Sequence, residues 1–138
     1  MLTILNMLLK NLKGYHIILA SKSPRRQELL KELDISFTIE TKEIEEVYPL
    51  ELTDFKISDY LSKLKATPFK NDLLANDLLI TSDTIVWVNN KALGKPKDYN
   101  EAFTMLTQLS NNTHKVITSI TITNLKFQKN SLRVVNYI

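Results

Sequence analysis

A short apolar run followed at once by a proline and two arginines limits the fold of this chain more than any other feature. Residues Ile17–Ala20 have the composition of a buried strand. Pro24 fits the first position of a helix, because it lacks an N–H and its φ is already helical. The order of strand, turn and helix predicts an α/β architecture.

The same junction is suited to binding a phosphate. A helix start has unpaired N–H groups and a partial positive charge. Ser21, Arg25 and Arg26 add hydroxyl and guanidinium donors there. The chain has only two glycines, Gly14 and Gly94, which excludes a glycine-rich phosphate loop. Side chains and the helix start would therefore have to hold any phosphate.

Hydrophobic periodicity predicts the other elements. In the last helix, which follows a capping aspartate, we expect Ala102, Met105, Leu106 and Leu109 to face the core. No domain boundary stands out, so the fold class is a single α/β domain over 1–138, with a mixed sheet and flanking helices. Helices are predicted over 24–33, 57–66 and 99–109, and strands over 15–20, 36–40, 78–80, 85–88, 91–93 and 116–123, with a turn at 89–90 and a closing strand over 132–137 left open.

Composition narrows the classes of function. The absence of cysteine excludes disulfides, thiolate metal sites and cysteine nucleophiles. The net charge is +3, and the charged residues are spread along the chain rather than grouped in blocks. This pattern suits an anionic small ligand and does not favour nucleic acid as a partner. The apolar start lacks a signal-peptide pattern and is too short to span a bilayer. We therefore expect a cytoplasmic protein without membrane association, whose translation could also begin at Met7.

Four further charged residues could form one site together with the junction residues. Each has an ordinary structural explanation: Glu46 as a loop charge, Lys65 as a last-turn lysine, Asp83 as a turn cap and Lys95 as part of a surface turn. Together, however, arginines and lysines can neutralise a triphosphate, while carboxylates hold a divalent cation or orient a water. The two isolated histidines are expected to be structural and do not make a zinc site.

Six motifs in order carry a resemblance over about residues 15–123. They begin with Leu-Ala-Ser-Lys-Ser-Pro-Arg-Arg-Gln-Glu-Leu-Leu at 19–30 and continue at 45–46, 64–66, 82–86, 93–98 and 109–118. This series resembles the Maf family, nucleoside triphosphate pyrophosphatases named for the inhibition of septum formation. The resemblance implies a mixed α/β fold related to inosine triphosphatases, with two lobes around a cleft.

The resemblance also implies an activity and a site. The activity is hydrolysis of a nucleoside triphosphate to the monophosphate and pyrophosphate with Mg²⁺ or Mn²⁺, and the run 83–86 resembles the branch that acts on dTTP and UTP. Asp83 would be the proton acceptor or a metal-linked acid, and Glu46 would assist metal or water binding, with Lys65 as the third catalytic residue. The phosphate-binding residues carried over are Ser21, Arg25, Arg26, Lys65 and Lys95.

Three departures from the family pattern leave alternatives open. Asp34 and Asn111 stand where the family usually has glycine, and nothing after Thr123 resembles the family's C-terminal part. We therefore expect a truncated or frameshifted copy whose residues 124–138 form a divergent tail. The chain is then an active pyrophosphatase or a weakly active or inactive member that only binds nucleotide. A DNA- or division-associated factor is least favoured, because no recognition helix is readable; a homodimer is left open.

Overall fold

The computed structural model describes residues 10–110 and 112–137. The alternative start at Met7 and the replaced glycine at Asn111 lie outside these residues. The elements are β1 (His16–Leu19), α2 (Pro24–Glu32), β2 (Thr38–Ile39), α3 (Phe55–Ala66), the 3₁₀ helix η1 (Thr67–Asp72), β3 (Asp77–Val88), β4 (Lys91–Leu93), α4 (Tyr99–Leu109), β5 (Lys115–Thr123) and β6 (Gln128–Tyr137).

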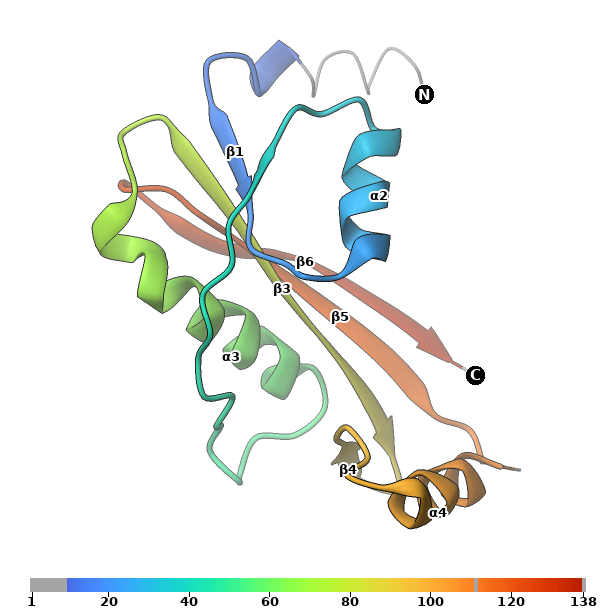
Figure 1. The fold of residues 1–138 in the computed structure, drawn as a ribbon. Coiled ribbons are helices and arrows are strands. Elements are labelled where there is room, and N and C mark those ends of the chain that lie inside the picture. Colours follow the sequence, from blue (N-terminus) through green and yellow to red (C-terminus); the bar gives the residue numbers. More distant parts are fainter. Residues whose placement is uncertain (1–9, 111, 138) are drawn as a thin grey trace.

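One mixed sheet organises the molecule (Figure 1). Its strand order is β2-β1-β3-β5-β6, with β4 paired to β3 off this path. The pairs β1–β2 and β1–β3 are parallel, whereas β3–β4, β3–β5 and β5–β6 are antiparallel. The predicted α/β class with a mixed sheet is confirmed, and the closing strand left open at 132–137 is part of β6.

Strand β3 corrects one prediction. The sequence pattern indicated two strands, over 78–80 and 85–88, but β3 is a single strand of 12 residues. Polar residues interrupt its hydrophobic pattern, yet β5 pairs with it continuously, from Leu79 opposite Thr123 to Trp87 opposite Lys115. Cross-strand hydrogen bonding thus carries the strand through its polar middle. Asp83 consequently lies inside a strand rather than in a turn after one.

The edge of β3 that faces away from β5 pairs with two different strands. Strand β1 pairs with its first part, up to Ile80, and β4 pairs with its last part, from Val86. Among the residues that the structure describes, no strand pairs with β3 between these two points on that edge. Figure 1 shows β4 and α4 at the end of β3 that is remote from β1. The middle of β3 is therefore, within the described part of the chain, an unpaired sheet edge on the side where β1 and β4 lie.

Helix α3 packs on β3 and β5 and joins two apolar clusters. It contributes Ala66 to one cluster and Ile57 and Leu61 to the other. Their remaining buried members come mainly from the sheet and η1. These are Ile18, Phe69, Leu73 and Leu79 in the first cluster, and Ile85 and Ile117 in the second.

Helix α4 forms where it was predicted but does not bury the expected face. Asp98 caps its start by accepting from the Glu101 N–H at 2.8 Å. None of its residues is buried, and Leu106 is 67% exposed. Periodicity predicts an amphipathic helix but not whether another element covers it. The helix lies close to β4, at the end of the molecule remote from β1 (Figure 1).

Three positions with left-handed backbone carry residues that tolerate it. Asn89 and Asn90 both have positive φ, 52° and 60°, and form the predicted turn between β3 and β4. Asp34, after the end of α2, has a φ of 60°. Asparagine and aspartate tolerate this conformation better than other residues with a Cβ. The missing glycine at position 34 is thus accommodated.

Hydroxyl groups join α3 to the sheet between the apolar clusters. We call this contact the hydroxyl seam: it comprises Ser58, Ser62, Thr81, Ser119 and Thr121, all with 0% exposure. Ser58 Oγ lies 2.6 Å from Ser119 Oγ, and Ser62 Oγ lies 2.6 Å from Thr121 Oγ1. Thr81 donates to the Ser62 carbonyl at 2.6 Å. The small side chains let the helix approach the strands closely while their hydroxyls remain satisfied.

The Ser62→Ala variant is expected to lower the free energy of unfolding by about 1–3 kcal/mol. Ser62 Oγ donates to the Asp59 carbonyl, so Thr121 must donate to Ser62. Alanine would leave the buried Thr121 hydroxyl without its acceptor. The Ser62→Ala/Thr121→Val double variant removes both groups and should recover part of the loss. Urea unfolding of the four proteins measures the coupling, and simple additivity would contradict the assignment.

Candidate active site

The start of α2 forms as the sequence predicted. Ser23 is the N-cap and accepts from the Arg26 N–H at 3.3 Å, while Pro24 occupies the first turn. Ser21 Oγ accepts from the Ser23 N–H at 3.1 Å, which holds the loop between β1 and α2. The backbone and hydroxyls of this junction thereby fix the point from which the Arg26 side chain reaches towards β3.

Lys65 brings three distant segments together. Its Nζ donates to Asp83 Oδ1 at 2.9 Å and to the Ser82 carbonyl at 3.1 Å. It also lies 3.2 Å from Glu46 Oε1, in the loop before α3. Lys65 occupies the last turn of α3, whose position is set by the hydroxyl seam and the apolar clusters. One ammonium group therefore connects the two predicted carboxylates.

Arg26 approaches the same stretch of β3. Its Nη2 donates to Thr84 Oγ1 at 2.7 Å, and its Nη1 lies 3.5 Å from the Ser82 carbonyl oxygen. The guanidinium thus contacts the residues on both sides of Asp83. Since this part of β3 has no strand on its open edge among the described residues, the Ser82 carbonyl is available to the two cations.

Asp83 is buried, and only one of its oxygens is bonded. The residue is 5% exposed, and Oδ2 has no hydrogen-bond partner within the described part of the chain. Burial raises the pKa of Asp83 above its ordinary value of 3.8; Lys65 and Arg26 oppose this change, and Glu46 adds to it. An unbonded carboxylate oxygen with a raised pKa can accept a proton or bind a cation.

Burial also lowers the pKa of Arg26, and the charges of Asp83 and Glu46 oppose that change. Arginine keeps its proton at physiological pH even so. The guanidinium is therefore a charged donor in a partly dry site. Its interaction with an anion is stronger there than on the open surface.

The raised pKa of Asp83 has a consequence for stability. Between 3.8 and the higher folded-state pKa, the folded protein binds more protons at this group than the unfolded chain does. Stability from Asp83 is thus complete below the unfolded-state value and is lost as the pH rises through the folded-state value. The Asp83→Asn variant should be more stable than the wild type at pH 8, and this advantage should shrink towards pH 4. Urea unfolding at both pH values measures the difference, and a constant difference would contradict it.

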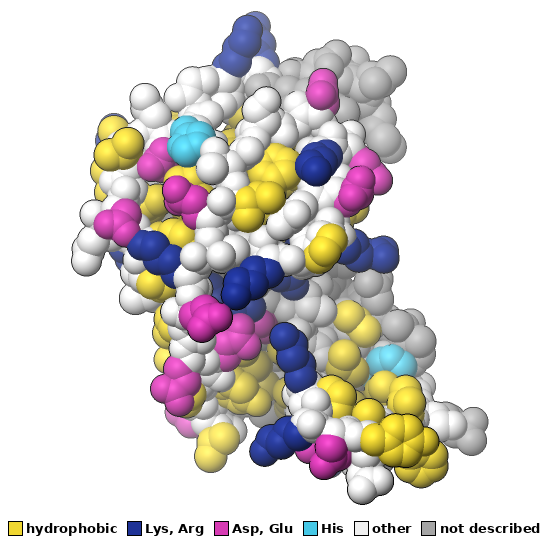
Figure 2. Space-filling model, viewed as in Figure 1, with side chains coloured by type: hydrophobic (Ala, Val, Ile, Leu, Met, Phe, Trp, Pro, Cys, Tyr) yellow, Lys and Arg dark blue, Asp and Glu magenta, His cyan; other side chains and the backbone are white. Residues whose placement is uncertain are grey.

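Two adjoining cavities open around these groups. A basic cavity of about 760 Å³ lies against the β1–α2 junction, and a wide cavity of about 1,110 Å³ lies against β3, β4 and β5. Figure 2 shows Lys, Arg, Asp and Glu side chains gathered across the middle of this face. The wall of the wide cavity includes an apolar part. The residues shared by both cavities are Ser23, Arg26, Glu46, Lys65 and Lys95.

The structure brings all seven predicted site residues to these cavities. Ser21 lines the basic cavity, Arg25 and Asp83 line the wide cavity, and the other four line both. Arg25 and Lys95 have no ion-pair partner among the side chains that the structure describes, those of residues 10–110 and 112–128. Their charge is therefore available to an anion, whereas that of Lys65 is already shared by two carboxylates.

Sequence reasoning missed several groups that line the wide cavity. The hydroxyls of Thr84 and Thr118 lie 2.9 Å apart, on β3 and β5. Their facing positions depend on the strand register, which the sequence did not give. The apolar wall was missed because its members lie in five separate segments: Tyr48, Ile57, Leu61, Ile85, Leu93 and Val116.

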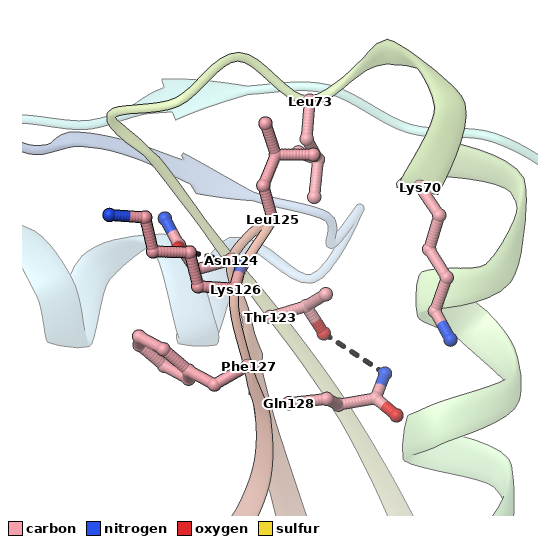
Figure 3. A pocket seen from close by; sticks show the side chains of 8 residues that line it. All are labelled: Lys70, Leu73, Thr123, Asn124, Leu125, Lys126, Phe127 and Gln128. Atoms are coloured by element: carbon pink, nitrogen blue, oxygen red, sulfur yellow. Dashed lines mark hydrogen bonds between the residues drawn. The ribbon is translucent and has the colours of Figure 1, made fainter.

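A smaller cavity of about 270 Å³ lies elsewhere (Figure 3). Residues of η1 and of the β5–β6 turn line it, including Lys70 and Phe127. Gln128 donates to Thr123 Oγ1 at 3.1 Å across its floor (Figure 3). None of the seven predicted site residues lines it. The candidate site is therefore the pair of cavities at the middle of β3.

The carboxylates of this site fit a hard divalent cation. Asp83 offers its unbonded Oδ2, and Glu46, with a half-exposed side chain, meets the same lysine. The described residues hold no group of three or more acidic, histidine or cysteine side chains placed for a metal. Mg²⁺ usually needs only one or two protein carboxylates, because substrate phosphates and waters complete its shell.

The chain matches a protein-family model and named relatives from other organisms. A family model described as "Maf-like protein" matches residues 16–137. A protein of Flavobacterium psychrophilum named dTTP/UTP pyrophosphatase is 54% identical over 132 residues, which are 96% of this chain and 66% of that protein. One of the same name from Flavobacterium johnsoniae is 54% identical over 114 residues, 83% of this chain and 59% of that protein. The chain thus spans about three fifths to two thirds of these relatives.

Solved structures agree with the fold. A HAM1 protein from Coxiella burnetii superposes with a TM-score of 0.53 at 14% identity, covering 89% of this chain and 69% of that one. This likeness supports the architecture alone. Within the described residues, no helix is long and apolar enough to cross a membrane.

Proposed function

Since the chain belongs to the Maf-like protein family, we propose that it hydrolyses nucleoside triphosphates, dTTP and UTP among them, to the monophosphate and pyrophosphate. The observation that carries the proposal is Asp83: a buried carboxylate with one unbonded oxygen, held beside Lys65 and Arg26 in a cationic cleft. The names of the relatives support the choice of dTTP and UTP.

Positive charge binds and orients the triphosphate. Arg25 and Lys95, which have no ion-pair partner among the described residues, contact phosphate oxygens together with Arg26 and Lys65. Ser21 adds a hydroxyl in the basic cavity. Charge neutralisation and positioning supply most of the catalysis of phosphoryl-type transfer. The basic cavity suits the part of the substrate that leaves as pyrophosphate.

Asp83 acts as the proton acceptor. A water attacks the α-phosphorus, its proton passes to Asp83 Oδ2, and the bond from that phosphorus to the bridging oxygen breaks. The new P–O bond belongs to the nucleoside monophosphate, and the electron pair of the broken bond leaves with pyrophosphate. Because burial raises its pKa, this carboxylate is a better base than an exposed aspartate.

Glu46 and Asp83 are the predicted ligands of Mg²⁺ or Mn²⁺, and Glu46 would hold the cation while Asp83 Oδ2 takes the proton, because that oxygen cannot do both at once. The cation would neutralise phosphate charge and polarise the reacting phosphoryl group. Lys65 keeps the two carboxylates near each other and limits their mutual repulsion.

The apolar wall of the wide cavity suits the nucleoside. It presents Tyr48, Leu93 and Val116 close to the charged centre, and small-molecule sites usually combine such walls with few polar groups. A cytoplasmic location, a part in septum formation and a homodimer remain predictions. Size-exclusion chromatography with light scattering tests the last of these.

A pyrophosphate-release assay with dTTP, UTP and dATP, in Mg²⁺ or Mn²⁺, tests the function. We expect equal release of pyrophosphate and monophosphate, faster for dTTP and UTP than for dATP. Chromatography of the nucleotides separates this reaction from stepwise removal of single phosphates. Absence of turnover above the Asp83→Asn variant would overturn the proposal. If calorimetry then detected nucleotide binding, the chain would be a binding-only family member.

A further inference from the structure

Three side chains from three elements form a line of hydrogen bonds along the wall of the wide cavity. Arg26 Nη2 lies 2.7 Å from Thr84 Oγ1, and Thr84 Oγ1 lies 2.9 Å from Thr118 Oγ1. Arg26 comes from α2, Thr84 from β3 and Thr118 from β5. Thr84 and Thr118 are direct partners in the antiparallel register, so their side chains share one face of the sheet.

Donor and acceptor chemistry gives the first bond of this line a direction. A guanidinium can only donate, so Thr84 Oγ1 accepts from Arg26. Thr84 Oγ1 keeps its own proton and a second lone pair, so it can either donate to the Thr118 hydroxyl or accept from it. Thr118 thereby fixes the rotamer in which the Thr84 lone pairs face Arg26. The second Arg26 contact, to the Ser82 carbonyl at 3.5 Å, is long and constrains the guanidinium less.

We propose that Thr118 is a positioning residue that acts through Thr84 to hold the Arg26 guanidinium for the triphosphate. The inference rests on the proposed function and goes beyond it, because it assigns a role to a hydroxyl on β5. A guanidinium that is anchored on one side keeps its remaining N–H groups in a fixed fork. Such preorganised donors stabilise developing charge better than mobile ones.

A double-mutant cycle between Thr118→Val and Arg26→Met tests the inference. Valine keeps the shape of threonine and removes the hydroxyl that bonds to Thr84. We expect Thr118→Val to lower kcat/KM about fivefold in the wild-type background, and to have almost no effect when Arg26 is already methionine. The affinity for a non-hydrolysable dTTP analogue should follow the same pattern. Thr118→Ser retains the hydroxyl and should keep nearly full activity.

Thr123→Val is the matched control for a hydroxyl lost from β5. Thr123 is buried on the same strand, bonds to Gln128 and lines neither cavity of the candidate site. Its loss should lower thermal stability without changing kcat/KM. Equal effects of Thr118→Val in both Arg26 backgrounds, or equal effects of the two valine variants on kcat/KM, would overturn the inference.

A measurement without substrate separates the inference from the proposed function. The ¹⁵N–¹H signals of the Arg26 guanidinium, assigned with Arg26→Met, report how freely the group rotates. We expect slow rotation in the wild type and in Thr118→Ser, and faster rotation in Thr118→Val. Unchanged rotation in Thr118→Val would refute the inference even if the enzyme is active. A wild type without turnover but with the expected rotation would refute the proposed function alone.

Discussion

The Asp83→Asn variant is expected to lose about 10²–10⁴-fold in kcat for dTTP hydrolysis while its fold remains intact. Asparagine keeps the shape of the side chain but cannot accept the proton of the attacking water. Lys65 retains two other partners, the Ser82 carbonyl and Glu46, so the site should not collapse. Steady-state kinetics at several pH values, with circular dichroism of both proteins, measures the effect.

Asp34→Asn is the matched control for this change. Asp34 is exposed, lies outside the two cavities of the candidate site and has a positive φ that asparagine tolerates. It should retain wild-type kcat. If Asp83→Asn also retained kcat, Asp83 would not be the proton acceptor, and another group would have to take the proton.

The Lys65→Met variant is expected to lower kcat/KM by about 10²–10³-fold. Methionine keeps much of the side-chain volume but removes the charge that binds phosphate and holds Asp83. Because Lys65 lowers the pKa of Asp83, its loss should raise that pKa further. A base must be deprotonated to act, so the acid limb of the pH–rate profile should move to higher pH.

Lys63→Met serves as the control on the same helix. Lys63 is exposed in the last turn of α3 and lines neither cavity of the candidate site. It should leave both kcat/KM and the pH profile unchanged. An unshifted acid limb in Lys65→Met would mean that Lys65 does not control the protonation of Asp83.

Local signals in the sequence predicted the elements better than the way in which they pack. Pro24, Asp98 and the Asn89–Asn90 pair each act within a few residues, and the elements that they predict are present. The continuity of β3 was missed because it comes from pairing with β5, which lies about 35 residues further along the chain. The exposure of Leu106 was missed because burial depends on a covering element, not on periodicity.

In the candidate site, too, single residues could be predicted but their spatial arrangement could not. The seven site residues could be named individually from the sequence and its resemblance to the family, and all seven lie at the two cavities. The proximity of Glu46 to Lys65 could not be read from spacing, because the intervening loop has no periodic pattern. Thr84 and Thr118 face each other only through register. Pairwise geometry of this kind becomes visible only in three dimensions.

The hydroxyl seam limits how far helix α3 can slide along the sheet. An apolar interface tolerates small axial sliding, because its contacts are not directional. A helix displaced by one residue moves about 1.5 Å, which is enough to break hydrogen bonds of 2.6 Å between buried hydroxyls. The hydroxyl seam thus fixes the axial position of α3, and with it the backbone from which Lys65 reaches Asp83.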